Sequence, residues 1–213
     1  MSDINSVPAC GEPYRHAHAV DQGFVRDRGN PTRRTRGADP DNRCIAFAGL
    51  GAHPAASGIH VHVDSTLLQS SLNYHQISTG LAYPMYYQTL FHELRDELTV
   101  AVQQAKRASA KGVWAVDQSM TGVTVTGLDS IAETGPVAGG AVIHPKLFRR
   151  LVEYLNLGGT DLSGFPAFLA QKADEFLVLS TGQFTTGLDA VVEVSGTTVK
   201  MTRPPEDPVF QEA

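Results

Sequence analysis

Two histidines lie on one face of a short alternating segment. Residues 59–63 read Ile-His-Val-His-Val, and alternate side chains of a strand share a face, so His60 and His62 point the same way. Two imidazoles at this spacing could bind zinc, but no cysteine or carboxylate completes a ligand set at recognisable spacing. We favour the alternative, the polar outer face of a half-buried strand. Further histidines stand at His16, His18, His53 and His75.

Three tyrosines gather in a connector that has no helical period, at positions Tyr83, Tyr86 and Tyr87. Pro84 pushes the residue before it into an extended conformation. Aromatic faces can stack on nucleic-acid bases, which contributes about 1–3 kcal/mol per base. The competing interpretation is that these rings pack against the rest of the fold.

Helices are predicted on both sides of this connector. The first begins after Asp64, whose side chain can accept hydrogen bonds from free backbone N–H groups, and ends at Gly80. Leu68, Leu72 and His75 recur at helical spacing, so we expect them to share one buried face.

The helix after the connector is marked by an apolar stripe and by its charge polarity. Acidic residues stand in its first turns and basic residues at its end, as the helix macrodipole favours. Gly112 is expected to stop this helix, and Trp114 to fold back over the core. The apolar stripe consists of Leu94, Leu98, Ala101, Val102, Ala105 and Ala108.

The order of these elements resembles a known domain. A helix ending in Gly-Leu-Ala, an extended tyrosine segment, a Glu/Lys/Ala-rich helix and Gly-x-Trp are similar to the C-terminal half of the staphylococcal-nuclease-like (thermonuclease) domain. The matching residues are 67–82, Tyr86 and 94–114. The resemblance implies a five-stranded OB-type barrel with packed helices. It also implies calcium held by carboxylates, a glutamate general base and two arginines that stabilise phosphate charge. An ordinary helical hairpin is the alternative.

The resemblance carries two site residues over to this chain. Residues 41–47 are similar to the family's second arginine strand, with Asp41 and Asn42 where tyrosine and glycine are usual. Arg43 is therefore the catalytic candidate, and a solvent-exposed arginine at a strand start is the alternative. Tyr86 aligns with a nucleotide-contacting position and is the nucleic-acid-binding candidate.

The family's acidic segment, Arg-(x)4-Asp-x-Pro-Glu, has no counterpart that we accept. Arg34 stands five residues before Asp39, but the proline follows that aspartate directly and no glutamate follows it. We therefore expect no metal site and no cofactor in this chain, although intact relatives bind Ca²⁺. Hydrolysis by this mechanism is expected to be weak or absent.

Residues 1–42 have an unusual composition. They contain no leucine and six arginines among Gly, Pro, His and Asp, without an apolar period. This composition is typical of a loop or disordered arm. Our sharper hypothesis is that the segment is not the ancestral start of the protein and reflects a truncation or a shifted reading frame.

Composition sets further bounds. The chain has 213 residues and a formal net charge of −5, so it lacks the basic balance typical of nucleic-acid-binding proteins. Two cysteines are too few to suggest a disulfide framework. The sequence has neither an apolar run that could cross a bilayer nor a signal-peptide pattern, so we expect a cytoplasmic protein without membrane contact.

Residues 118–213 follow the resemblance as an extension of mixed structure. We expect a strand at 123–125, a helix opened by Pro145, a short helix at 165–171, a strand at 176–179 and a hairpin turning at Gly196. Lys146, Arg149 and Arg150 are expected on a solvated helix face. The tail from Pro204 is acidic and proline-rich, without predicted structure.

These observations predict an α+β protein in three parts. Residues 1–42 form the arm, 43–117 an incomplete OB-type barrel with two packed helices, and 118–213 a small α+β extension. The predicted function is that of a thermonuclease-like protein, related to calcium-dependent phosphodiesterases, that binds nucleic acid weakly and has little or no activity. The alternative is a non-catalytic nucleic-acid or protein interaction module, with the extension meeting a protein partner.

Overall fold

The computed structural model describes residues 62–108, 112–132, 140–159 and 161–211, together with the backbone of three short strands. These strands are β1 (Ala19–Asp21), β2 (Phe24–Val25) and β3 (Ile45–Ala46), and they pair antiparallel in the order β2-β1-β3. β3 lies within residues 41–47, the segment that is similar to the family's arginine strand. β1 and β2 lie in the arm for which no regular structure was predicted, so that prediction is wrong at these two segments.

Two short helices take the place of the first predicted helix. α1 spans Ser65–Gln69, and α2 spans Leu72–Ser78. Asp64 caps α1 as expected, because its Oδ1 accepts a hydrogen bond from the backbone N–H of Leu67 at 2.8 Å. A second cap follows directly: Ser71 Oγ accepts from the N–H of Tyr74 at 3.0 Å and starts a new helix.

The break between α1 and α2 changes which residues are buried. Leu68 is fully buried, but Leu72 is 39% exposed and His75 is exposed, while Ile77 is buried instead. The predicted common face of Leu68, Leu72 and His75 is therefore wrong, because it assumed one continuous helix.

The helix after the connector is α3, which spans His92–Arg107. Its buried residues are Leu94, Leu98, Ala101 and Val102, the first four members of the predicted stripe. The helix ends before Gly112, with Ala108 at its C-terminal cap. Gly112 instead opens a short 3₁₀ helix, η1 (Gly112–Ala115).

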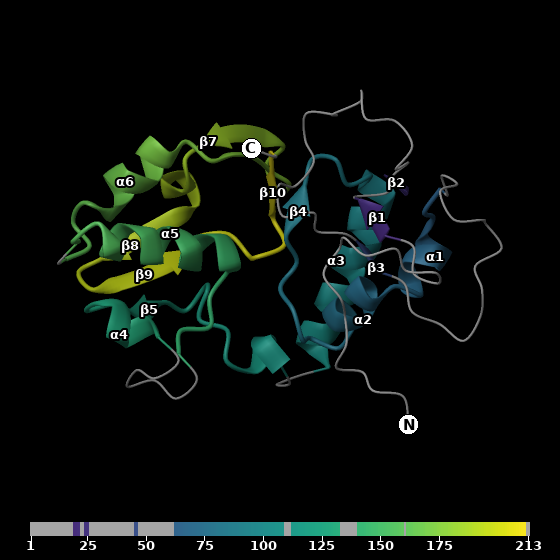
Figure 1. Ribbon diagram of the computed structural model, residues 1–213, viewed down its shortest axis with the longest axis horizontal. Helices are drawn as coiled ribbons and strands as arrows, with labels where there is room; N and C mark the ends of the chain where they lie inside the picture. The colour runs from purple at the N-terminus through teal and green to yellow at the C-terminus, as the bar shows by residue number, and fades with distance from the viewer. Residues whose placement is uncertain are drawn as a thin grey trace.

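A four-stranded sheet, called here the central sheet, lies in the middle of the molecule (Figure 1). Its order is β4-β10-β6-β7, with bounds Tyr86–Tyr87, Pro208–Phe210, Glu175–Val178 and Gln183–Thr186. β10 pairs parallel with β4 and antiparallel with β6. The tail, for which no element was predicted, thus supplies an inner strand. This is possible because Pro208 is the first residue of β10, and a missing N–H is tolerated at the first position of a strand.

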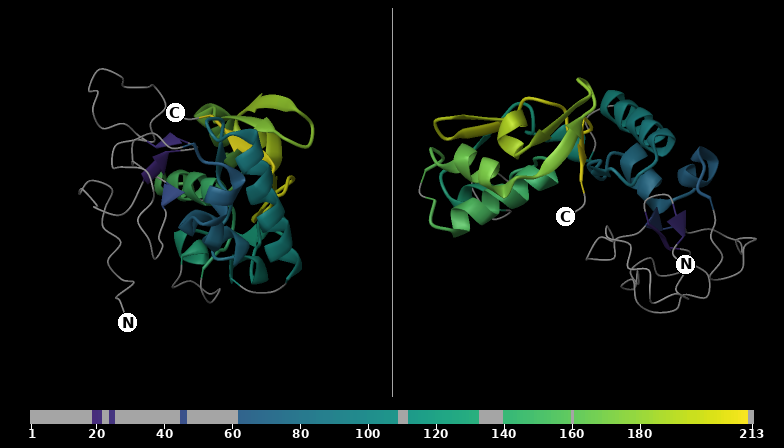
Figure 2. Two further views of the ribbon diagram at one scale, coloured as in Figure 1. Left: turned by 90° about the vertical axis from the view of Figure 1, so that its right-hand side faces the viewer. Right: turned by 90° about the horizontal axis from the view of Figure 1, so that it is seen from above.

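The central sheet separates two hydrophobic cores. One core contains α1–α3, and β4 and β10 add Tyr86 and Val209 to it. We call α1–α3 the helical part and the elements after residue 118 the C-terminal part. The second core lies in the C-terminal part, and the next residues of the same strands, Tyr87 and Phe210, face it. Alternation along a strand explains why neighbouring residues serve opposite cores. Seen from above, the helical part and the C-terminal part lie on either side of β4 and β10 (Figure 2).

The C-terminal part contains a second sheet and the remaining helices. β5 (Val123–Thr124), β9 (Thr198–Met201) and β8 (Val192–Ser195) pair in that order, and Gly196 turns the β8–β9 hairpin with φ of 59° as predicted. The helices are α4 (Leu128–Ile131), α5 (Pro145–Asn156), α6 (Phe165–Lys172) and the 3₁₀ helix η2 (Leu188–Val191). α5 begins at Pro145, and α6 agrees with its predicted range to within a residue.

The basic face of α5 is not simply solvated. Asp174 is buried, and its carboxylate accepts from Lys146 Nζ at 2.9 Å and from Arg150 Nη2 at 2.6 Å. Burial alone would raise the pKa of Asp174, but these hydrogen bonds and positive charges outweigh it and lower the pKa. Only Arg149 is exposed as predicted.

The protein is α+β, as the sequence indicated. The described strands form three open sheets. The central sheet pairs β4, which comes before residue 117, with β10, β6 and β7, which come after it. Among the described helices, none is long and apolar enough to cross a membrane.

Candidate functional site

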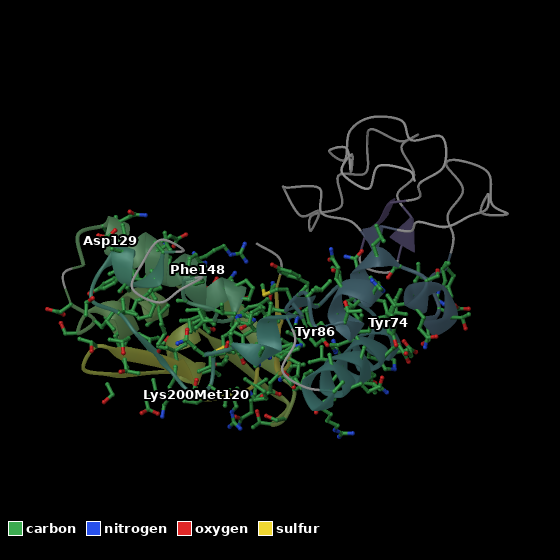
Figure 3. All side chains as sticks on the ribbon, turned by 90° about the horizontal axis from the view of Figure 1, so that it is seen from below. Tyr74, Tyr86, Met120, Asp129, Phe148 and Lys200 are labelled. Carbon is green, nitrogen blue, oxygen red and sulfur yellow. The ribbon has the colours of Figure 1, made fainter. Side chains whose placement is uncertain are left out.

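The resemblance gave two site residues, Arg43 and Tyr86, and neither lies on a surface that the structure describes. Arg43 lies outside the described residues. Tyr86 is 1% exposed, and its hydroxyl lies 2.9 Å from Thr99 Oγ1 on α3. Burial raises the pKa of this phenol. Tyr86 belongs to the hydrophobic core of α1–α3, and Figure 3 shows it close to the C-terminal part. Its role in base stacking stays a prediction that the burial does not support.

Tyr83 is the tyrosine of the connector that takes part in a polar network. Its ring packs edge-on against Trp114 at 5.0 Å between centroids, and its hydroxyl donates to Asp117 Oδ1 at 2.6 Å. Burial, then the hydrogen bond to the carboxylate, raises the pKa of Tyr83. The phenol is therefore a persistent hydrogen-bond donor at neutral pH.

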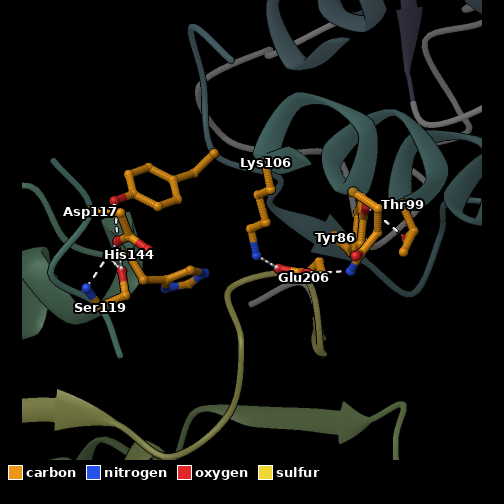
Figure 4. A network of polar contacts seen from close by, with 9 residues as sticks. Tyr86, Thr99, Lys106, Asp117, Ser119, His144 and Glu206 are labelled. Atoms are coloured by element: carbon orange, nitrogen blue, oxygen red, sulfur yellow. Dashed lines mark hydrogen bonds and ion pairs between the residues drawn. The ribbon is translucent and has the colours of Figure 1, made fainter. Parts of the chain in front are cut away.

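Asp117 and Ser119 form the centre of this network (Figure 4). Asp117 Oδ1 accepts from the backbone N–H of Ser119 at 2.9 Å and from its hydroxyl at 2.5 Å. An aspartate commonly bonds the backbone two residues ahead in this way. Ser119 Oγ in turn accepts from the backbone N–H of His144 at 2.8 Å. The network thereby ties the connector and the segment after η1 to the start of α5.

His144 is the unusual member of the network. Its side chain is fully buried, and neither ring nitrogen has a hydrogen-bond partner within the described structure. The ring lies 5.9 Å from Phe210 and 6.5 Å from Tyr83, between centroids. Burial, with a further contribution from the positive charge of Arg149, lowers the pKa of His144 to about 3. The imidazole is therefore neutral at physiological pH.

A second polar cluster joins α3 to the segment before β10. Glu206 is buried, and its carboxylate accepts from Gln103 Nε2 at 2.8 Å and from Lys106 Nζ at 2.5 Å. The same ammonium lies 4.5 Å from the centre of the Trp114 ring. Such a cation–ring contact is favourable where water is partly excluded. We refer to both clusters together, Tyr83, Asp117, Ser119, His144, Gln103, Lys106 and Glu206, as the junction network.

The junction network contains a serine, an aspartate and a histidine, the residue types of a catalytic triad. The hydroxyl of Ser119 donates to Asp117, and the imidazole of His144 bonds to neither of them. A hydrolase needs its serine activated by an adjacent base, so this serine, aspartate and histidine do not form a catalytic triad. The network instead holds the helical part and the C-terminal part together.

The metal hypothesis gains no support from the described residues. Within residues 62–108, 112–132, 140–159 and 161–211, no group of three or more His, Cys, Asp or Glu side chains is placed to hold an ion. Of the predicted histidine pair, His62 is exposed and lies 6.4 Å from the Phe91 ring, between centroids, while His60 lies outside the described residues.

Sequence reasoning passed over Asp117, Ser119 and His144. The Asp-x-Ser spacing was an available signal, because it is typical of a side chain that bonds its own backbone two residues on. The His-Pro pair before α5 marked a helix start but gave no sign of burial. Comparison of the chain with protein-family models, with curated proteins and with solved structures found no significant match.

Proposed function

We propose that the chain carries the helical scaffold of a thermonuclease-like protein and binds nucleic acid weakly, with little or no phosphodiester hydrolysis. The proposal includes the finer statement of fold: α1–α3 correspond to the helices that pack on an OB-type barrel in that family. It rests on the resemblance of residues 67–82, Tyr86 and residues 94–114, and the following geometry supports it.

The observation that carries the proposal is the way the two ends of the helical segment meet. The Gly-Leu-Ala that follows α2 and the Gly-x-Trp that follows α3 are two of the elements whose order and spacing carry the resemblance. In the structure the N–H of Val113 donates to the carbonyl of Gly80 at 2.9 Å, and Trp114 packs on Tyr83 of the connector. Residues far apart in the motif thus form one local unit.

The weak activity follows from the residues that the family's chemistry needs. Only Arg43 has a counterpart, and one arginine can stabilise phosphate charge but cannot activate water. Without a recognisable glutamate base or an acidic metal segment in the sequence, hydrolysis at an appreciable rate is not expected.

The test is a nuclease assay of the purified chain on single-stranded DNA and RNA, with calcium or with a calcium chelator. We expect the same slow background in both conditions. Calcium-dependent cleavage that an Arg43→Ala change abolishes would refute the claim of weak activity, although it would strengthen the family assignment.

Binding is measured separately, by fluorescence anisotropy of a labelled single strand at several salt concentrations. We expect weak binding whose logarithmic salt slope falls by about 0.7 when Arg43 is changed to Ala, since one phosphate contact is lost. Arg149→Ala, at an exposed arginine of the C-terminal part, is the matched control. Failure to bind at low salt would overturn the nucleic-acid part of the proposal.

The second candidate is a non-catalytic protein interaction module. Large apolar side chains that are exposed in the C-terminal part, Leu157 and Phe184, favour it. Under this proposal the Arg43→Ala variant keeps its partner contacts, whereas changes at the exposed apolar residues remove them.

A further inference from the structure

β7 is an edge of the central sheet with no described strand on its outer side. It pairs with β6 alone. Three of its four residues are exposed, and Phe184 is 69% exposed. A large aromatic residue on an open strand edge provides both backbone hydrogen-bonding groups and apolar surface to a partner.

The hydrogen-bonding pattern identifies the backbone groups that are free for a partner. The N–H of Gly187 donates to the carbonyl of Asp174 at 2.9 Å, one position beyond the last paired residues of β6 and β7. Hydrogen-bonded and non-hydrogen-bonded positions alternate in an antiparallel ladder. Thr185 therefore directs its backbone groups toward β6, and Phe184 and Thr186 direct theirs outward.

β7 lacks the features that normally protect an edge. Gln183, Phe184, Thr185 and Thr186 include no charge and no proline. The other four-residue edge strand, β8, differs because it carries Glu193, which pairs with Lys200 at 3.3 Å. Charged edge residues discourage strand pairing, so within the described strands one long edge is protected and the other is open.

We infer that β7 pairs with β7 of a second copy of this chain, antiparallel about a two-fold axis. In the register that pairs the outward groups of Phe184 and Thr186 with each other, Phe184 lies opposite Thr186 of the second copy and Thr185 lies on the axis. Each Phe184 ring then covers the methyl group of the opposite threonine, and aromatic with β-branched pairs are favourable across strands. A two-fold axis brings like residues together, which an uncharged strand tolerates and a charged one does not.

The short strand limits the strength of this pairing. Four residues on each side bury less surface than a stable interface needs, so a weak, concentration-dependent dimer is expected. The pairing joins two four-stranded sheets into one and leaves the junction network untouched.

The experiment is sedimentation velocity of the full chain from micromolar to near-millimolar concentration. We expect the mean sedimentation coefficient to rise toward that of a dimer. Phe184→Lys should weaken the association about tenfold or more, since both aromatic pairs are lost and two like charges approach each other. Ser195→Lys is the matched control, because it adds the same charge to the exposed edge of β8. A monomer at all concentrations, or a dimer that Phe184→Lys leaves intact, overturns the inference.

A cross-link tests the register. With Cys10 and Cys44 changed to Ser, Thr185→Cys places two thiols at a non-hydrogen-bonded pair on the axis, where side chains are close enough for a disulfide. We expect a disulfide-linked dimer from mild oxidation of this variant and a much lower yield from Ser195→Cys in the same background. Equal yields from both would refute the proposed pairing.

Discussion

At the scale of single residues, the buried imidazole of His144 stands apart from the rest of the junction network. Most buried polar atoms in a folded protein have a partner, and here two ring nitrogens have none. Protonation is opposed by burial and by the nearby cations Arg149 and Lys146, and Asp117 is the opposing negative group. The residue is therefore neutral in the folded state under conditions in which the unfolded chain binds a proton.

This difference predicts an acid-sensitive stability. The folded pKa of about 3 lies below the unfolded value of 6.5. The stability that the neutral, buried imidazole of His144 gives is therefore fully present above pH 6.5 and is lost as the pH falls toward 3. Each pH unit below 6.5 costs about 1.4 kcal/mol for one proton. Urea unfolding between pH 7 and pH 5 measures the slope, because most carboxylates remain ionised there.

His144→Phe isolates the effect. A phenyl ring fits an aromatic environment and does not titrate, so we expect the free energy of unfolding of this variant to vary less between pH 7 and pH 5 than in the wild type. His75→Gln, which removes an exposed histidine, is the control variant. The same slope in His144→Phe and in the wild type would show that another group is responsible.

At the scale of elements, the close approach of the chain after α2 to the start of η1 depends on one glycine. Gly112 has φ of +63°, and a Cβ atom there would lie 2.0 Å from the carbonyl oxygen of Gly80. A backbone atom cannot move aside as a flexible side chain can. The close approach allows the N–H of Val113 to bond the carbonyl of Gly80, next to Trp114, which packs on Tyr83.

Gly112→Ala should therefore lower the free energy of unfolding by more than the strain of placing alanine at positive φ, because its Cβ atom would also clash with the carbonyl oxygen of Gly80. Gly182 provides the matched comparison, since its φ is +68° and a Cβ atom there would meet nothing within 4 Å. We expect Gly112→Ala to lower the free energy of unfolding by about 1–3 kcal/mol more than Gly182→Ala. Chemical denaturation of both variants measures the difference, and equal losses would mean that the backbone relaxes without cost.

Sequence patterns predicted some of the helices and strands and missed others. α3 and α5 were predictable because a sustained 3.6-residue period and a terminal proline are local signals. The break at Ser71 was not, since serine is compatible with a helix interior or with a cap. β10 was not predicted, because the acidic and proline-rich sequence around it is not typical of a strand. The turn at Asp117 and Ser119 had a local signal, but the rest of the junction network did not, because its members meet through tertiary contacts that leave no local period.

At the scale of the whole molecule, β10 is shared between the two cores. Val209 belongs to the core of α1–α3 and Phe210 to the core of the C-terminal part. The ion pair between Lys106 and the buried Glu206 reinforces the same junction. The two parts are therefore expected to unfold together rather than as separate units.

Phe210→Ala tests this coupling. Removing a fully buried phenylalanine should cost about 3–5 kcal/mol. Hydrogen exchange should show that the amides of α3, on the other side of the sheet, lose protection by the same free energy as those of α5. Phe184→Ala removes the same side chain from an exposed site of the same sheet and should leave both helices protected. Unchanged exchange in α3 after Phe210→Ala would mean that the helical part is independently stable.

The hydrogen bond between Gln103 and Glu206 joins residues 103 positions apart in the chain, and this separation constrains the order of events during synthesis. The helices emerge from the ribosome well before β10, so the apolar face of α3 remains without Val209 while the intervening segment is being made. Closing so long a loop is slow and costs entropy. The nascent chain therefore passes through an interval in which its helices are complete and their core is open, and apolar surface exposed in this way favours aggregation until β10 is made.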